Sequence, residues 1–321
     1  MERYVYGIDV GGTNIKIGLF SINPIKRITK VEIKTPMENQ RTKTFDNIIK
    51  KIIEVNEKNK ITFENIIGIG LAVPCPTTDG KTGICPNIDL GDLAIDKEFK
   101  KRIPKHIEVT VSNDANMAAL GEYMQVSQKY KNAVFYTLGT GVGGGVIING
   151  KILEGYNGTA GEFGHMQVFE PNNTMCGCGK SGCLEQVTGT KGMLELAKHF
   201  SKYKKSLVEK DELTIKDIYD FAKMGDDVAK RVVDNAMEAL ATSASILAVT
   251  INPDVFIIGG GVSNAGNFLI DRLKHFYQEK ARFNTGNTPF ILAKLKNDAG
   301  IYGAAHYVCE VINDGYKEVL L

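Results

Sequence analysis

GEFGHMQVFEPNNTMCGCGKSGCLE, from Gly161 to Glu185, is the stretch around which we expect this chain to be organised. Three of the six cysteines of the chain lie in it, at Cys176, Cys178 and Cys183, and His165 precedes them. Three thiolates and one imidazole are an accepted ligand set for structural zinc, because both suit a borderline-soft ion in tetrahedral geometry. The alternative is a cysteine-rich loop with a disulfide or free thiols. We favour zinc, because such a cluster in a chain with the features of an intracellular protein more often binds metal than forms a disulfide.

The length and composition indicate a globular protein of two domains. A chain of 321 residues is long for one hydrophobic core, and 43% apolar with 24% charged residues is an ordinary balance. The formal net charge of +2, without a basic stripe interleaved with aromatics, argues against nucleic acid as a partner. No apolar run reaches the length of a membrane span, and the start lacks the apolar core of a signal peptide. We therefore expect a cytoplasmic protein that binds no membrane.

A glycine turn near the start of the chain separates two apolar segments. Tyr4–Val10 reads as a strand, and the sequence Asp9-Val-Gly-Gly-Thr-Asn-Ile-Lys16 leads into a second strand at Ile17–Phe20. The exposed amides of such a turn, with the Thr13 hydroxyl, can hold phosphate oxygens, and Asp9 can hold magnesium through water. The alternative is a plain β-hairpin with an Asp-containing turn. No helix follows the glycines, so this is not a dinucleotide-binding fingerprint.

Two further glycine runs follow apolar strands. Gly139-Thr-Gly-Val-Gly-Gly-Gly145 lies between strands at 133–138 and 146–148, and an Asn149-Gly150 turn follows. A second glycine hairpin predicts a second phosphate clamp and suggests duplicated halves. Gly259–Gly261 ends the strand Asp254–Ile258, where a ribose or base can lie flat against the backbone; a simple tight turn is the alternative.

A carboxylate stands at a predicted strand–helix junction. The strand His106–Val111 precedes a helix that begins at Asn113-Asp114, with Ser112 or Asn113 as its cap. Asp114 can be a general base that reaches into a cleft, or it can complement the positive end of the helix. On this feature alone the second interpretation is favoured.

The order of strands and helices predicts two α/β domains, each with a mixed sheet and with a cleft between them. We place one domain at residues 1–112, joined by 299–321 because a final helix at Ala299–Ile312 returns to it, and the other at 113–298. The remaining cysteines, Cys75, Cys85 and Cys309, read as ordinary small apolar residues.

Several motifs in this order resemble the ROK family of sugar kinases and repressors, on the actin-like (RNase H-like) ATPase fold, and most of all its bacterial glucokinase branch. The resemblance covers nearly the whole chain. The motifs are Asp9-Val-Gly-Gly-Thr13, Asn113-Asp-Ala-Asn116, Leu138–Gly145, Gly161-Glu-Phe-Gly-His165, the cluster Cys176–Glu185 and Ile258-Gly-Gly-Gly261.

The resemblance implies a division of labour among these residues. The glycine hairpins would grip the phosphates of ATP, with Asp9 near Mg²⁺, and Gly259–Gly261 would line the adenosine site. The nucleotide-binding residues would be Asp9, Gly11, Gly12, Thr13, Lys16, Gly139, Thr140, Gly141, Gly143, Gly259, Gly260 and Gly261. The sugar hydroxyls would be held by Asn87, Asn113, Asp114, Glu162, His165 and Glu185. Asp114 would be the general base, and His165, Cys176, Cys178 and Cys183 would bind zinc.

The implied reaction is ATP-dependent phosphorylation of a hexose, with D-glucose to glucose 6-phosphate as the first choice. N-acetylmannosamine, mannose, fructose and allose are alternatives. A sugar-sensing repressor of the same family is less favoured, because Asp9 lies too near the start for a preceding DNA-binding domain. A catalytic zinc is also disfavoured, because four protein ligands leave no open position. The resemblance further suggests a homodimer or homotetramer.

The chain departs from the family pattern near the expected sugar site. Many relatives have Pro-Gly-Pro where this chain has Pro74-Cys75-Pro76. Glucokinases of the family often have a tryptophan shortly after the segment that is Asn87–Gly91 here, and this chain contains no tryptophan. The exact hexose therefore stays open at the level of sequence.

Overall fold

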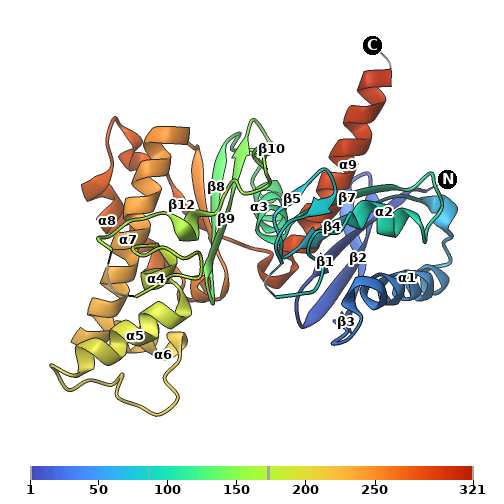
Figure 1. The fold of residues 1–321 in the computed structure, drawn as a ribbon. Coiled ribbons are helices and arrows are strands. Elements are labelled where there is room, and N and C mark those ends of the chain that lie inside the picture. The colour runs from blue at the N-terminus through green and yellow to red at the C-terminus, as the bar shows by residue number, and fades with distance from the viewer. Residues whose placement is uncertain (1, 86, 172–173, 320–321) are drawn as a thin grey trace. The chain divides into compact units, whose positions relative to one another are not determined.

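The computed structural model describes residues 2–85, 87–171 and 174–319, and the chain forms two compact units (Figure 1). Unit 1 comprises Met1–Val126, Lys151–Ala160 and Asn297–Leu321, whereas unit 2 comprises Ser127–Gly150 and Gly161–Lys296. Each unit combines a mixed sheet with helices, as the sequence predicts.

The regular elements of unit 1 follow the predicted alternation of strands and helices. In chain order they are β1 (Tyr4–Val10), β2 (Asn14–Ile22), β3 (Ile25–Lys34), α1 (Gln40–Asn59), η1 (Phe63–Asn65), β4 (Ile66–Val73), β5 (Thr77–Thr78), β6 (Lys81–Thr82), α2 (Ile95–Lys100), β7 (Glu108–Asn113), α3 (Asp114–Met124), β10 (Lys151–Ile152) and α9 (Ala299–Val319).

The main sheet of unit 1 has the order β3-β2-β1-β4-β7. Strands β1, β2 and β3 form an antiparallel meander, whereas β4 and β7 run parallel to β1. The sequence accounts for this difference, because β4 is an almost continuous buried apolar run, and β3 alternates half-buried with exposed residues, as suits an edge strand.

Helices cover both faces of this sheet. Residues of α1 and α2 pack with Tyr6 and Ile8 of β1, whereas residues of α9 pack with Val5 on the opposite face. Successive side chains of a strand point to opposite faces, so Gly7 shares the α9 face with Val5. A Cβ atom at Gly7 would lie 1.9 Å from the Ile301 carbonyl oxygen, so glycine is what lets α9 lie directly on the sheet.

Helix α3 approaches α9 in the same way. A Cβ atom at Gly121 would lie 2.2 Å from the Ala299 carbonyl oxygen, and one at Gly303 would lie 1.8 Å from the Met117 carbonyl oxygen. This contact corrects our boundary near Ser112. Helix α3 belongs to unit 1 because it packs on α9, and the segment Lys151–Ala160 returns to the same unit.

Unit 2 repeats the scheme of a glycine hairpin followed by parallel strands. Its strands are ordered β9-β8-β11-β12; β8 and β9 are antiparallel, and β11 and β12 run parallel to β8. Its elements are β8 (Ala133–Leu138), β9 (Val142–Ile148), η2 (Phe163–His165), α4 (Glu185–Thr188), α5 (Thr190–Ser201), α6 (Ile215–Met224), α7 (Asp227–Ile251), β11 (Val255–Gly259), η3 (Gly261–Ala265), α8 (Asn267–Lys280), η4 (Thr285–Asn287) and β12 (Phe290–Leu292).

One helix in the described part of the chain, α7, is long and apolar enough to cross a membrane. Of its most apolar window, 61% is buried inside the protein. Its residues Val232, Ala236 and Leu240 are fully buried in the core of unit 2, which is how a core helix of a globular protein behaves.

We predict that Gly303→Ala destabilises unit 1 by about 2 kcal/mol or more, because the added methyl group overpacks the contact with Met117. The intrinsic preference of helices for alanine, about 1 kcal/mol, acts in the opposite direction and is too small to compensate. Urea unfolding measures the difference. Gly83→Ala is the matched control, because its nearest neighbour would be the Pro76 carbonyl oxygen at an ordinary 3.7 Å. A Gly303→Ala protein as stable as wild type would contradict the close-packing argument.

Candidate functional site

The first glycine turn places a carboxylate near the start of α9. Asp9 follows Val5 and Gly7 on the face of β1 that meets this helix, and a Cβ atom on Gly300 would lie 3.1 Å from the Asp9 Cγ. Lys16 Nζ lies 3.0 Å from Asp9 Oδ2. The end of β1 therefore combines a carboxylate with an ammonium group beside a glycine turn.

The turn itself is fixed by hydrogen bonds to the end of β3. The buried Thr35 donates its hydroxyl to the Gly11 carbonyl oxygen at 2.6 Å, and its amide donates to the Thr13 carbonyl oxygen at 3.0 Å. Asn87 lies against this turn, because a Cβ atom on Gly12 would be 3.0 Å from the Asn87 carbonyl oxygen. The predicted phosphate turn and the predicted sugar residue Asn87 are thus neighbours in unit 1.

The junction between β7 and α3 is built as a helix cap. Asn113 is the N-cap, and its Oδ1 accepts hydrogen bonds from the amides of Ala115 and Asn116 at 2.9 and 3.2 Å. Its Nδ2 donates to the Cys75 carbonyl oxygen at 3.3 Å. Asp114, the first helical residue, is partly exposed, and its Oδ1 accepts the Ala115 amide at 2.8 Å. Capping therefore fixes the backbone from which the Asp114 carboxylate projects.

The structure adds Glu154, which the sequence analysis missed. Its carboxylate accepts hydrogen bonds from the Ser112 hydroxyl and, at 2.9 Å, from the Tyr307 hydroxyl of α9. Burial, together with the charge of Glu154, raises the pKa of Tyr307. No local signal marks Glu154, because it lies in an irregular segment after β10, and its partners are 42 and 153 residues away in sequence.

Cys75 and Cys85 correct a second expectation. They form a disulfide rather than two separate apolar packing residues. Cys75 follows β4, and Cys85 lies in the loop before Asn87, so the sequence pattern alone did not bring them together. Cys309 is buried among apolar residues of unit 1, as expected.

The second glycine turn, in unit 2, is held by a carboxylate. Glu185 Oε2 accepts the Val142 amide at 3.0 Å. A Cβ atom on Gly141 would lie 2.1 Å from the same oxygen, so no larger residue fits there while Glu185 keeps this position. Gly143 continues the hairpin on β9, opposite Thr137. Glu185 therefore orders the glycine turn, whatever else it binds.

The four predicted metal ligands converge. The ligand atoms of His165, Cys176, Cys178 and Cys183 all lie within 4.8 Å of one another. Cys176 Sγ is 3.5 Å from His165 Nδ1, and the sulfurs of Cys178 and Cys183 are 3.6 Å apart. Two sulfurs ~2.3 Å from one tetrahedral zinc lie ~3.8 Å from each other, so these residues fit the ion.

The thiols of this cluster differ in their surroundings. Burial raises the pKa of the Cys183 thiol to about 12, whereas a backbone hydrogen bond at Lys180 lowers the pKa of the exposed Cys178. Glu162 is exposed and begins the short η2 turn that carries His165, whose amide donates to the Glu162 carbonyl oxygen at 3.1 Å. The same turn thus presents a predicted sugar carboxylate and a predicted metal ligand.

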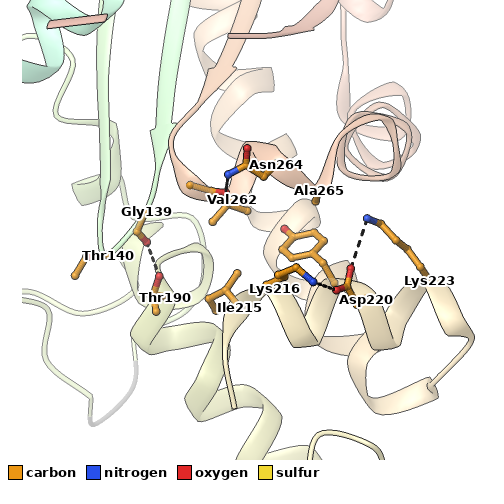
Figure 2. Close-up of a pocket in the computed structure, with 12 residues that line it drawn as sticks. Gly139, Thr140, Thr190, Ile215, Lys216, Asp220, Lys223, Val262, Asn264 and Ala265 are labelled. Atoms are coloured by element: carbon orange, nitrogen blue, oxygen red, sulfur yellow. Dashed lines mark hydrogen bonds and ion pairs between the residues drawn. The ribbon is translucent and has the colours of Figure 1, made fainter. Parts of the chain in front are cut away.

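A cavity of about 450 Å³ lies in unit 2 beside the second glycine turn (Figure 2). Three segments form its wall: the turn with the start of α5, one face of α6, and η3 after β11. The lining residues are Gly139, Thr140, Thr190, Ile215, Lys216, Tyr219, Asp220, Lys223, Gly261, Val262, Asn264 and Ala265.

Hydrogen bonds and charges order this wall. Thr190 donates its hydroxyl to the Gly139 carbonyl oxygen at 2.9 Å, and Lys216 pairs with Asp220 at 2.5 Å (Figure 2). The buried Tyr219 hydroxyl has no hydrogen-bond partner within the described residues, and burial raises its pKa. A cavity of this size, with apolar walls and a few polar groups, suits a nucleoside.

Gly260 connects the cavity to the sheet. It has a left-handed φ of 81°, and a Cβ atom there would lie 2.2 Å from the Leu138 carbonyl oxygen. Only glycine combines that conformation with so close an approach. The strand ends of β8 and β11 therefore meet at the edge of the cavity, and Gly261 next to them lines it.

Comparison with known proteins places the chain in a family. The ROK family profile matches residues 5–311. A glucokinase of Halalkalibacterium halodurans is 35% identical over 327 residues, which cover 98% of this chain and 98% of that protein. An N-acetyl-D-glucosamine kinase of Vibrio atlanticus is 31% identical over 315 residues, covering 94% and 98%.

The fold agrees with a solved structure of a ROK family glucokinase from Streptomyces griseus in complex with glucose and AMPPNP. The TM-score is 0.74 at 27% identity, and the match covers 96% of this chain and 99% of that one. The expected actin-like fold of α/β units is thereby confirmed. With a family profile that spans nearly its whole length, this chain belongs to the ROK family.

Proposed function

We propose that this protein is a sugar kinase that transfers the γ-phosphoryl group of Mg-ATP to a hydroxyl of a hexose, with D-glucose as the preferred acceptor. The observation that carries the proposal is the capped junction of β7 and α3. It fixes Asn113 and Asp114 in the same unit as Asn87 and the first glycine turn, in a chain that resembles a glucokinase over 98% of its length.

The proposed roles in unit 1 follow from phosphoryl-transfer chemistry. Little covalent work is required of the protein, so positioning and neutralisation of charge supply most of the rate. Asp114 accepts the proton of the attacking hydroxyl, the 6-OH in glucose, as the bond to phosphorus forms. Asp9 and Lys16 lie together beside the glycine turn, where a carboxylate suits magnesium and an ammonium group suits phosphate.

The proposed nucleotide site in unit 2 is the cavity next to Gly139–Gly141 and Gly261. Its volume and its apolar side chains fit an adenosine, and the amides of the glycine turn suit its phosphates. Asp9 of unit 1 would hold the magnesium ion, which would supply positive charge that offsets the charge developing on the phosphates. The AMPPNP of the Streptomyces griseus glucokinase supports the assignment of ATP as donor.

The proposed metal is a structural zinc ion held by His165, Cys176, Cys178 and Cys183. Because His165 turns its Nδ1 toward Cys176, its Nε2 stays available for a sugar hydroxyl. Metal binding at one nitrogen fixes the tautomer and orientation of the ring. Glu162 and Glu185, at the two ends of the same stretch, complete the proposed set of sugar ligands in unit 2.

The choice of hexose is the finest part of the proposal. Glucose is favoured by the glucokinase of Halalkalibacterium halodurans, whereas the relative from Vibrio atlanticus is an N-acetyl-D-glucosamine kinase. A coupled ADP-release assay across glucose, mannose, fructose, allose, N-acetylglucosamine and N-acetylmannosamine decides between them. We expect the highest kcat/KM for glucose, and a higher value for an N-acetylated sugar would replace glucose as the assigned substrate.

We also propose that the enzyme is cytoplasmic and forms a homodimer or homotetramer. Light scattering coupled to size-exclusion chromatography measures the oligomeric state, and a monomeric mass would contradict this part of the proposal.

Asp114→Asn is predicted to lower kcat by roughly 10²- to 10⁴-fold, because the amide cannot accept the proton of the attacking hydroxyl. Glucose binding, measured by calorimetry, is expected to remain detectable because the amide keeps the size of the carboxylate. Asp46→Asn is the matched control, because Asp46 lies on α1 and pairs with Arg102 at the surface. Unchanged turnover in Asp114→Asn would remove Asp114 from the role of base.

Cys178→Ser is predicted to lower the zinc content well below one ion per chain and to raise the KM for the sugar, because the brace on His165 is lost. Zinc is measured by atomic emission, and KM by the coupled assay. Lys180→Ala in the same loop is the control, because its side chain is not a ligand. Loss of zinc with an unchanged sugar KM would separate the metal from sugar binding.

A further inference from the structure

The disulfide between Cys75 and Cys85 joins two loops of unit 1, and none of the proposed catalytic roles accounts for it. The two residues are 10 positions apart, with their Cα atoms 4.8 Å from each other. Cys75 is fully buried, whereas Cys85 is half-buried. The other four cysteines of the chain are free thiols, and three of them belong to the proposed zinc site of unit 2.

One end of the disulfide is anchored to the helix cap. The Cys75 carbonyl oxygen accepts the hydrogen bond from Asn113 Nδ2, and the Cys75 amide donates to the Val73 carbonyl oxygen at 2.8 Å. Asn113 in turn fixes the start of α3, where Asp114 stands. Cys75 is therefore a rigid point beside the proposed base.

The other end lies in the loop that carries Asn87. Gly83 donates its amide to the Pro76 carbonyl oxygen at 2.8 Å, which fixes the start of the loop. Beyond Cys85, the Asn87 backbone touches Gly12. The disulfide thus spans from the cap of α3 to the loop that packs against the first glycine turn.

The remaining restraints on this loop act mainly after Asn87. The side chains of Ile88 and Leu90 are buried, and the Asp89 amide donates to Gln40 Oε1 at 2.6 Å. The ion pair of Arg41 with Asp89 is exposed on both sides, and such pairs contribute little. Before Asn87, Ile84 is 83% exposed, so this part of the loop is restrained by the covalent bond at Cys85 and by the backbone hydrogen bonds of Gly83 with Pro76 and Asp92.

We propose that the Cys75–Cys85 disulfide positions the Asn87 loop for sugar binding, so that its reduction weakens sugar binding more than nucleotide binding. The inference rests on the proposed function, which assigns Asn87 and Asn113 to the sugar. It adds a redox-sensitive control of that site. The cavity proposed for adenosine, in unit 2, contains no part of this link, and the link reaches the proposed phosphate turn only through the contact of Asn87 with Gly12.

The redox step is thiol–disulfide exchange with a dithiol reductant. A thiolate of the reductant attacks the more accessible Cys85 sulfur, and the Cys75 sulfur leaves as a thiolate. The second thiol of the reductant, deprotonated, then attacks the mixed disulfide and releases the Cys85 thiolate. Two electrons pass from the dithiol to the cystine, the reductant becomes a disulfide, and protons equal to those it lost neutralise the two new thiolates. A disulfide oxidant reverses these steps.

The test compares the oxidised and the reduced full-length protein. Diamide treatment gives the first form and dithiothreitol the second, each followed by desalting and zinc repletion. Alkylation with iodoacetamide after unfolding, read by mass spectrometry, is expected to label four cysteines in the oxidised protein and all six in the reduced one. On reduction the KM for the sugar is expected to rise roughly 3- to 10-fold, because a freed loop must be ordered again when the sugar binds. The KM for ATP is expected to stay within about twofold of its value in the oxidised protein.

Two variants sharpen the comparison. Cys85→Ala is expected to have the high sugar KM of the reduced protein, and dithiothreitol is expected to leave that KM unchanged. Cys309→Ala, which removes a free thiol on α9, is expected to keep the reductant response of wild type. Six labelled cysteines after diamide, or equal sugar KM values for the two verified forms, would overturn the proposal. If Cys85→Ala fails to fold, the two forms of the wild-type protein still decide it.

A substrate-independent measurement separates this inference from the proposed function. Hydrogen exchange followed by mass spectrometry is expected to be faster for the segment 83–91 in the reduced protein, and unchanged in α7 of unit 2. If no hexose is phosphorylated by either form, the proposed function fails, and the exchange data still decide whether the disulfide positions the loop. Equal exchange of segment 83–91 in both forms would refute the positioning role.

Discussion

The close contact of α9 with the backbone of unit 1 is the constraint on which this half of the protein depends. At Gly7 and Gly70 of the sheet, a Cβ atom would lie 1.9 and 2.0 Å from carbonyl oxygens of α9, and Gly303 makes the equivalent contact with α3. The helix thus packs on both the sheet and α3, the helix that begins at Asp114. Helix α9 follows unit 2 in the sequence, so unit 1 is built from segments on both sides of unit 2.

Several side chains that the sequence analysis assigns to substrate binding also form hydrogen bonds that fix the backbone. Asn113 caps α3 and fixes Cys75, and Glu185 binds the Val142 amide in the second glycine turn. Gly141 illustrates the consequence. Its lack of a side chain was attributed to phosphate binding, and the structure supplies a separate reason, because a Cβ atom would collide with Glu185. Substitutions at such positions change the local backbone together with the chemistry.

Local patterns predicted the elements and the convergence of His165 with Cys176, Cys178 and Cys183. The hairpin around Asp9–Lys16 and the cap at Asn113 follow from rules that act over a few residues, and both occur as expected. The convergence of His165 with the three cysteines could be predicted in the same way, because the four residues lie close together in the sequence.

What the sequence left unresolved depends on contacts between distant segments. The boundary near Ser112 was wrong because no local signal reveals that α3 packs on α9. Glu154 was missed because Ser112 and Tyr307 meet it only in the folded chain. The Cys75–Cys85 pair was misread for the same reason, since an intervening turn, β5 and β6, brings the two loops together.

The thiols of the protein fall into two sets with different redox chemistry. The sulfurs of Cys178 and Cys183 are 3.6 Å apart, close enough to be oxidised to each other unless a metal holds them as ligands. Among the described residues, no histidine or third thiol joins Cys75 and Cys85 in a metal-binding group, so the chemistry left to them is the formation and reduction of their disulfide. In a reducing compartment a disulfide persists only transiently unless it is resistant to reduction. A redox-sensitive link requires the first behaviour, that it can be reduced and formed again. A metal that protects the first set would therefore leave the second as the pair that responds to the redox state of the cell.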